Sequence, residues 1–304
     1  MMMMGSKSMV RILLLSAAWG ISFLMMRVAV PDYPPLWIAW LRCGLGAGLM
    51  WGVLVAGRRH LPSRRLLPWL LLVALLNNAL PFSLFAWGEV WVPSNTAAVL
   101  NATTPIWTLL LAATLDRRLP RGFTTVGVVL AFLGVLVVVL THAPDAAAGG
   151  AGAGGLWWGT LAIGAAAVCY AVASLLAKAK LTGLDPIGLA TTQLSLATLL
   201  LAAPALLTAW PREFLAPAPL AAIAVLGFVG SGIAYLLYYK LLAEVTATQV
   251  VAVTYLLPVW GVFWGAVGGE VIGAATYMGV AITVGGLVLL NLGSARRTAI
   301  APQR

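Results

Sequence analysis

Two stretches of the chain place a proline two residues before a tryptophan in the middle of a long apolar run. They are Asn101-Ala-Thr-Thr-Pro105-Ile-Trp107 and Thr254-Tyr-Leu-Leu-Pro258-Val-Trp260. A proline inside a helix removes one backbone hydrogen bond and clashes with the carbonyl one turn earlier, so we expect each helix to kink there. Within a membrane, protein or water must satisfy the freed carbonyl. The matched kinks predict two halves that meet at a shared cavity, with Pro105 and Pro258 as hinges of a transporter.

Arg42 lies seven residues into an apolar segment that begins at Pro35. A charged side chain at such depth in a membrane is costly and is by default a functional candidate. The alternative is structural: the side chain snorkels to the interface or bonds carbonyls at a helix end. Both interpretations are open from the sequence.

Uncharged polar residues inside apolar segments form a second set of candidates. Polar side chains that face lipid are penalised, so we expect most of them to line the interior or a wet cavity. The alternative is hydrogen bonding between helices, worth ~0.6–2 kcal/mol each. These residues are Ser22, Asn77, Asn78, Asn101, Thr104, Ser174, Gln193 and Thr254.

Aromatic residues within the apolar segments form the third set. Tryptophan and tyrosine usually belong to the belts at the membrane interfaces. Rings in mid-segment fit that role poorly and are better placed as cavity walls, where they can stack on an organic substrate. The predicted substrate-binding rings are Trp19, Phe82, Trp107, Tyr170, Tyr235, Tyr238, Tyr255 and Trp260.

The composition of the chain places these candidates in a membrane protein. Of 304 residues, 62% are hydrophobic and 9% are charged, and the mean hydropathy is +1.00. Soluble domains carry about 45–50% apolar and about 25% charged residues. The net charge of +10 is scattered over short connections, which argues against nucleic-acid binding. Cys43 and Cys169 both fall in apolar segments, so no disulfide framework, metal site or cofactor is expected.

Ten segments are long and apolar enough to cross a bilayer, which takes about 20 residues. They span approximately 10–30, 35–56, 66–88, 94–115, 122–141, 156–178, 186–209, 218–240, 245–268 and 272–293. With the N-terminus in the cytoplasm, the inner connections hold every Lys and Arg except Arg27, Arg42 and Arg212. This satisfies the positive-inside rule and predicts a multi-pass protein of the cell (inner) membrane with both termini cytoplasmic.

An internal repeat relates the two halves. A shift of 151 to 153 residues aligns Trp19 with Tyr170, Arg27 with Lys178, Pro35 with Pro186, Arg42 with Gln193, Pro105 with Pro258, Gly127 with Gly279 and Gly134 with Gly286. The predicted domains are a first repeat at 1–141, an Ala/Gly-rich outer linker at 142–155, a second repeat at 156–293 and a cytoplasmic tail at 294–304. With an odd number of helices in each, the fold class is all-α with two inverted five-helix repeats, the geometry of alternating access.

The ordered set of motifs resembles the EamA-type domain. The first copy has Trp19-Gly20-x-Ser22-Phe23, Pro35 seven residues before Arg42, and Pro105 eleven before Asp116; the second has Pro258, Glu270, Gly279 and Gly285-Gly286. The match covers residues 10–293 and resembles the ten-helix branch of the drug/metabolite transporter superfamily. Two departures are Asp116, where the family often has Glu, and Gln193, which replaces the Arg of the first copy.

The carboxylates bear on the driving force. All acidic residues sit at segment ends or in connections, and so do His60 and His142, whereas ion-driven carriers usually place an acid or His near the midplane. Facilitative export is therefore the favoured mechanism, with coupling through an acid at a segment end left open. No embedded acid–His pair, metal spacing or phosphate loop suggests an enzyme.

A cavity rich in rings, amides and hydroxyls and poor in charge suits a neutral or zwitterionic organic solute. Within the family, this profile resembles exporters of amino acids, aromatic ones included. The alternatives are proton-coupled multidrug efflux, a passive channel, and a membrane structural or interaction protein. The expected partners are a small-molecule substrate and the lipid bilayer, with the protein a monomer or weak homo-oligomer.

Overall fold

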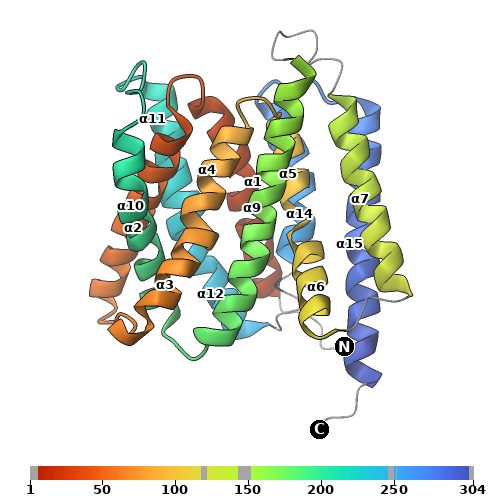
Figure 1. Ribbon diagram of the computed structural model, residues 1–304, viewed down its shortest axis with the longest axis horizontal. Helices are drawn as coiled ribbons and strands as arrows, with labels where there is room; N and C mark the ends of the chain where they lie inside the picture. Colours follow the sequence, from red (N-terminus) through yellow and green to blue (C-terminus); the bar gives the residue numbers. More distant parts are fainter. Residues whose placement is uncertain (1–5, 118–121, 143–151, 246–249, 251, 301–304) are drawn as a thin grey trace.

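The computed structural model describes residues 6–117, 122–142, 152–245, 250 and 252–300. This described part consists of helices and their connections, without a strand (Figure 1). The helices of the first half are α1 (Ser6–Ala29), α2 (Pro35–Ala56), η1 (Arg64–Leu66), α3 (Leu67–Ala74), η2 (Leu75–Ala79), α4 (Leu80–Gly88), α5 (Ser94–Asn101), α6 (Thr104–Leu115) and α7 (Phe123–Thr141). Those of the second half are α9 (Gly152–Lys180), α10 (Pro186–Leu206), α11 (Pro217–Ala224), η3 (Val225–Ile233), α12 (Ala234–Glu244), α14 (Ala252–Val267) and α15 (Ala274–Ile300).

These helices form a bundle of apolar spans. Among the described residues, nine stretches are long and apolar enough to cross a membrane, and Val253–Val267 is a shorter apolar helix. Part of the predicted ninth span, 246–249 and 251, and the centre of the predicted linker, 143–151, lie outside the described residues. In the predicted tail, α15 continues as a helix to Ile300.

Prolines begin several of the helices. The N–H of the first helical residue has no partner within the helix, so its absence in proline costs no hydrogen bond, and the φ of proline is already helical. Pro35 begins α2 and Pro217 begins α11. Pro186 begins α10, where the Asp185 carboxylate also accepts a hydrogen bond from the Gly188 N–H at 2.9 Å. This is a side-chain N-cap, which satisfies a donor that the helix itself leaves free.

The two kink prolines behave differently. Ala102 and Thr103 form a turn that separates α5 from α6 just before Pro105. Pro258, by contrast, lies inside α14, which is continuous from Ala252 to Val267. The expected interruption is therefore complete in the first half of the chain, whereas the second half keeps an unbroken helix around its proline.

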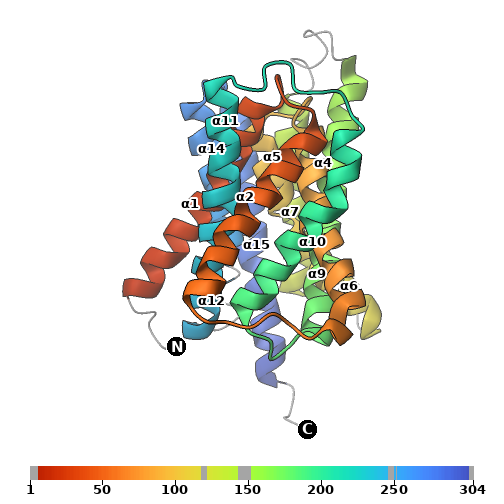
Figure 2. The same cartoon turned by 90° about the vertical axis from the view of Figure 1, so that its left-hand side faces the viewer.

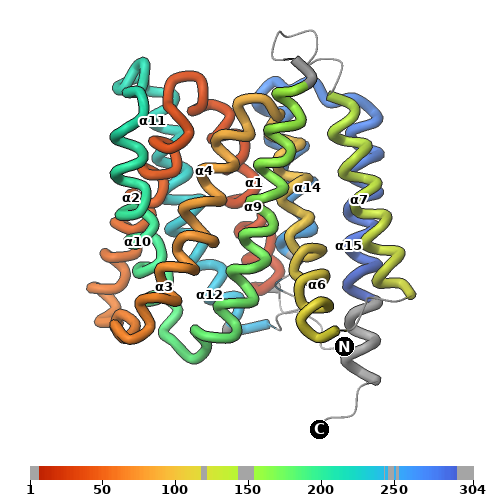
Figure 3. The backbone as a smooth tube through the Cα atoms, viewed as in Figure 1, coloured from red at the N-terminus to blue at the C-terminus, as the bar shows by residue number. Residues whose placement is uncertain are grey.

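We call the end of the bundle at which α1 begins and α15 ends the terminal end, and the opposite end the far end (Figure 3). The second half starts at the far end, because α9 runs from there toward the terminal end (Figure 1). Helices α2 and α10 lie side by side (Figure 2), at the side of the bundle opposite α7 and α15 (Figure 1). Helices α7 and α15 form a pair at one side of it (Figure 1).

Four glycines allow α7 and α15 to approach closely. A Cβ on Gly127 would lie 2.6 Å from the Gly286 carbonyl oxygen, and one on Gly134 would lie 2.6 Å from the Gly279 carbonyl oxygen. Both contacts are therefore backbone against backbone, as small residues permit in membrane helix pairs. The pairing is reciprocal: Gly127 matches Gly279 in the repeat but contacts the match of Gly134. Such reciprocity is the pattern of a two-fold contact.

The third and eighth spans each contain a π-helical segment at matching positions. The first is η2, between α3 and α4, and the second is η3, between α11 and α12. A π-helical turn holds one more residue than an α-turn and is often found at functional sites. Helix α2 contacts both segments, and α10 contacts η2.

Candidate functional site

The two π-helical segments bring polar side chains together between α2, α10 and α12. From η2, the Asn77 Nδ2 donates to the Gln193 Oε1 at 3.2 Å and to the Tyr235 hydroxyl at 3.1 Å. The neighbouring Asn78 Nδ2 donates to the same hydroxyl at 2.8 Å. Both asparagines therefore point into the bundle, and they tie the first half of the chain to two helices of the second.

Arg42 joins this group from α2. Its side chain is buried, and its Nε donates to the Ser231 hydroxyl at 3.1 Å, with Nη2 3.5 Å from the Gly230 carbonyl oxygen. Its guanidinium carbon lies 3.8 Å from the centre of the Phe82 ring, a cation–π contact. The enclosed side chain argues against snorkelling, and the bond to a carbonyl is present.

We call these residues the central polar cluster: Arg42, Asn77, Asn78, Gln193, Ser231 and Tyr235. Within the described residues, Arg42 has no carboxylate at ion-pair distance, because the ion pairs there join Arg11 to Glu244 and Arg59 to Asp185. A buried arginine without an ion-pair partner is a candidate site for an anion. Neutral donors and acceptors surround it.

Aromatic rings cover the far-end side of the cluster. The Phe85 ring packs on Phe23 with centroids 5.6 Å apart and stacks on Tyr170 at 6.1 Å. Phe82, one turn earlier on α4, carries the Arg42 guanidinium. Phe82 and Tyr170, two of the rings predicted to bind substrate, therefore both lie on this side of the cluster. Ser22 of α1 also lies here, since its hydroxyl occupies the space into which a Cβ on Gly230 would point.

The two predicted tryptophans lie elsewhere and do not meet. The Trp107 Nε1 donates to the Thr103 hydroxyl at 3.1 Å, and its ring packs on Phe132 of α7 at 5.5 Å. The Trp260 Nε1 donates to the Ser16 hydroxyl of α1 at 2.9 Å. Each indole thus has a local partner, and the structure does not join the two rings at a common cavity.

Other predicted residues also take positions outside the cluster. Trp19 packs on Tyr238 with centroids 5.8 Å apart, and Tyr255 lies in an apolar group with Ile106. Two predicted hydroxyls bond the backbone of their own helical turn. The Thr104 hydroxyl donates to the Asn101 carbonyl oxygen at 2.7 Å, and the Ser174 hydroxyl donates to the Ala171 carbonyl oxygen at 2.8 Å. The Asn101 Oδ1 is buried without a hydrogen-bond partner in the described part of the chain, which fits a position beside the break between α5 and α6.

Acidic residues at the far end are more buried than their place at span ends suggested. The Glu270 carboxylate accepts hydrogen bonds from the Ser94 N–H at 2.7 Å, the Asn95 N–H at 3.2 Å and the Asn95 Nδ2 at 2.6 Å. It therefore caps the N-terminus of α5, where a negative charge is favourable. Glu89, the residue after α4, is completely buried. Sequence reasoning missed both roles, and it missed Ser231, which only the Gly-Ser-Gly run at 230–232 could have signalled.

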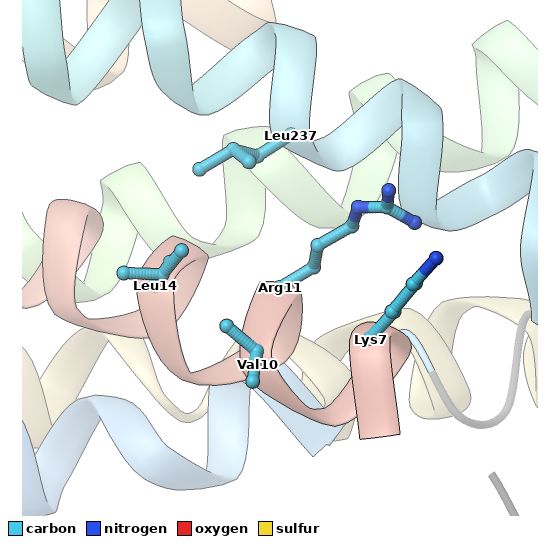
Figure 4. A pocket seen from close by; sticks show the side chains of 5 residues that line it. All are labelled: Lys7, Val10, Arg11, Leu14 and Leu237. Carbon is cyan, nitrogen blue, oxygen red and sulfur yellow. The ribbon is translucent and has the colours of Figure 1, made fainter. Parts of the chain in front are cut away.

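A separate surface pocket of about 380 Å³ opens between α1 and α12 near the terminal end (Figure 4). Its lining consists of Lys7, Val10, Arg11, Leu14 and Leu237. The Arg11 guanidinium forms an ion pair with the Glu244 carboxylate. The pocket shares no residue with the central polar cluster, so we do not assign the solute site to it.

A comparison with protein-family models assigns the chain. The model described as the EamA-like transporter family matches residues 6–140 and again 157–292. The chain belongs to this family. The EamA-like resemblance predicted from the residues is thereby confirmed, and the protein is a membrane transporter built from two copies of this unit.

Relatives of this EamA-like transporter agree with the assignment. The Escherichia coli K12 protein named "Uncharacterized inner membrane transporter YedA" is 27% identical over 284 residues, which cover 90% of this chain and 87% of that one. The Escherichia coli K12 "Probable amino-acid metabolite efflux pump" is 30% identical over 137 residues, 45% of this chain and 44% of its own. A crystal structure with 19% identity superposes with a TM-score of 0.67 and covers 96% of this chain and 99% of its own, which shows a shared fold.

Proposed function

We propose that this EamA-like transporter exports amino acids, aromatic and other neutral ones, or similar small metabolites, across the inner membrane. The observation that carries the proposal is the buried guanidinium of Arg42, which lies among neutral groups and beside aromatic rings. A carboxylate is the natural partner of a guanidinium, which can bind it through two parallel hydrogen bonds. The relative named as a probable amino-acid metabolite efflux pump supports this substrate class.

The rest of an amino acid also finds matching groups in the cluster. The amide oxygens and the tyrosine hydroxyl of Asn78, Gln193 and Tyr235 can accept hydrogen bonds from an ammonium group, and the Asn78 Oδ1 is buried without a partner within the described residues. Phe82 and Phe85 offer ring faces to an apolar or aromatic side chain. The carboxylate, the ammonium group and the side chain of an amino acid would thus each meet a suitable group in the cluster.

The proposed mechanism is alternating access between two inverted repeats. Two observations support it: the reciprocal glycine contacts between α7 and α15, and the opposite ends at which α1 and α9 begin (Figure 1). In inverted repeats the substrate site lies at the repeat interface near the midplane. The central polar cluster has that character, since Arg42 and Asn77 each bond a residue of the other half. The distribution of Lys and Arg supports placing the terminal end in the cytoplasm.

Efflux from liposomes tests the proposal. Purified protein is reconstituted into vesicles loaded with a labelled aromatic amino acid, and the efflux rate is followed against concentration for the wild type, Arg42→Gln and Arg42→Lys. Saturable efflux that Arg42→Gln abolishes and Arg42→Lys weakens would support the assignment. Arg212→Gln, in an exposed connection, is the matched control and should behave as the wild type. Saturable efflux that is equal in all four proteins would reject Arg42 as the anchor.

A second candidate function is proton-coupled efflux of hydrophobic organic compounds. The observation that favours it is the complete burial of Glu89. A facilitative carrier was favoured because every acid lies at a span end, and a buried acid there can still bind a proton. Competition in the same vesicles separates the two functions. A lipophilic cation that blocks amino-acid efflux at low concentration, while being carried itself, would favour the multidrug alternative over the amino-acid exporter. Conductance without saturation would favour a passive channel.

A further inference from the structure

Glu89 is the most unusual side chain of the far end. It follows the last residue of α4, is 0% exposed, and neither carboxyl oxygen has a hydrogen-bond partner among the described residues. Arg27 of α1 comes close, but its Nη1 donates to the backbone carbonyl of Glu89 at 2.9 Å and not to the carboxyl group. The ion pairs in the described part of the chain do not include Glu89 either.

An ionised carboxylate without partners in a dry interior is costly, and the neutral acid is far cheaper to bury. Glu270, from the connection between α14 and α15, is the other acid of this region, and three N–H donors stabilise its charge. Of the two acids, Glu89 is the one without donors among the described residues that would stabilise a negative charge. Burial and the Glu270 charge raise the pKa of the Glu89 carboxyl, whereas the Arg27 and Arg42 charges lower it.

The remaining neighbours of Glu89 do not supply a counter-charge. Helix α9 packs along α4 and faces this region with Tyr170, whose ring stacks on Phe85. Helix α5 presents Ser94 and Asn95, which the Glu270 carboxylate occupies. The charged groups near Glu89 are thus two arginines and one carboxylate, and none of them bonds its carboxyl oxygens.

One face of the third span connects Glu89 with the central polar cluster. Phe82 and Phe85 of α4 and its C-cap residue Glu89 are spaced three and four residues apart and are all buried. This spacing places them on a single helical face. Asn78 and Phe82 contact the cluster, the Phe85 ring packs on its neighbours, and Glu89 lies beyond that ring at the far end. Any movement of α4 that opens the cluster to the far end therefore also exposes Glu89.

We propose that Glu89 is a proton-binding site whose protonated form keeps the far end closed. When the far end opens around Glu89, water reaches the carboxyl group. Its O–H bond then breaks, the electron pair stays on the carboxylate, and the proton passes to water at that end. The ionised carboxylate is now hydrated and near Arg27, so the open form is stabilised. A high proton concentration at the far end returns the proton and favours closure.

The consequence for transport is a dependence on the pH at the far end, and this part of the inference rests on the proposed function. Glu89 gives its proton to the far end and takes it back from the same end, so this cycle carries no net proton across the membrane. Acid at the far end holds the protonated, closed form and slows the opening that releases the solute. A less acidic far end favours the open form.

Infrared spectroscopy of the purified protein in lipid nanodiscs tests the proton site without any substrate. A buried neutral carboxylic acid has a C=O stretching band distinct from that of a carboxylate. We expect this band at neutral pH in the wild type, its disappearance in Glu89→Gln, and its retention in Glu213→Gln, a change of an exposed acid in a connection at the same end. A band that survives Glu89→Gln unchanged, or is absent from the wild type, would overturn the proposal.

Efflux from liposomes with and without a pH gradient tests this dependence. We expect an acidic far side to lower the rate of amino-acid efflux in the wild type, in Glu213→Gln and in Glu89→Asp, which keeps a titratable carboxyl. In Glu89→Gln, a neutral isostere of the protonated acid, the ratio of the two rates should be one. A wild-type ratio in Glu89→Gln would overturn this pH dependence. If no variant carries the amino acid, the proposed substrate fails, and the infrared band alone decides the proton site.

Discussion

Arg42 and Gln193 occupy matching positions in the two repeats, on α2 and α10, and each bonds a π-helical segment of the other half. Their partners differ in kind. The glutamine oxygen accepts a hydrogen bond from Asn77, so this neutral pair satisfies itself, whereas the arginine keeps a full charge among neutral groups. The contact between a helix and a π-helical segment is therefore repeated in the two halves, but the charge of the side chain that makes it is not. A two-fold frame with one charged side can hold an asymmetric, zwitterionic solute in a single orientation.

The largest effect should come from making the two sides alike. Arg42→Gln removes a charged hydrogen-bonding partner, which is worth ~1.5–3 kcal/mol, so we expect the apparent affinity for the amino acid to fall by ~10-fold to ~100-fold. Binding measured by calorimetry in detergent checks this change. The double variant Arg42→Gln/Gln193→Glu serves as a comparison. It carries an acid on the opposite side of the cluster, which repels the carboxylate of the solute, so binding should not be restored. Unchanged affinity in Arg42→Gln would contradict the asymmetric site.

The glycine pairs test the symmetric part of the comparison. An alanine at Gly134 would place its Cβ against the α15 backbone, and such overpacking costs ~1–3 kcal/mol. We expect a clear loss of thermal stability, followed by the fluorescence-detected melting of the detergent-solubilised protein. Gly279→Ala, on the other side of the same contact, should cost a similar amount. Gly285→Ala, with open space around its Cβ, is the matched control, and a loss there as large as at Gly134 would refute the close-contact explanation.

A smaller effect is expected from the neutral side of the cluster. Asn77→Ala removes hydrogen bonds to Gln193 and Tyr235, worth ~0.5–1.5 kcal/mol for neutral partners. The predicted weakening of substrate binding is ~2-fold to ~10-fold. Thr198→Ala, on the same helix as Gln193 and with its hydroxyl bonded to its own backbone at 2.8 Å, provides a control. If Asn77→Ala weakened binding more than Arg42→Gln, the charged side would not dominate the site.

The prolines should give the smallest effect and the clearest contrast between the halves. Because α14 is continuous across Pro258, Pro258→Ala should leave the efflux rate within about twofold of the wild type while the helix gains a backbone bond. Pro105→Ala removes the residue next to the break between α5 and α6, and we expect it to slow efflux more strongly. Equal rates in both variants would show that the break does not contribute to the conformational change.

Much of the architecture could be predicted from the residues. Apolar length marks the spans, and the family resemblance carried by Pro35, Arg42 and Pro105 is confirmed by the matched family model. Asn77, Asn78 and Arg42 stand out because polar groups in lipid are costly. These predictions rest on the free-energy cost of placing a polar group or a proline in an apolar helix. That cost can be read from the sequence because it does not depend on which helices are neighbours.

The identity of the meeting side chains could not be predicted in this way. Each π-helical turn adds a residue, and one residue rotates the following side chains by about 100° around the helix axis. A periodicity argument that assumes a regular helix therefore misplaces the faces after η2 and η3. Trp107 and Trp260 lie on α6 and α14, outside these two spans. Although they match in the sequence, they bond Thr103 and Ser16 in different parts of the bundle.

The sequence by itself determined a membrane transporter of two repeated units, because hydropathy, charge and motif order are properties of the chain alone. Only the tertiary structure decided which polar groups share the interior and which acid is hidden. Glu89 looks like an exposed residue at the end of a span, yet it is completely buried. The reason is physical: exposure depends on which neighbouring helices exclude water from a residue, and those neighbours come from distant parts of the chain.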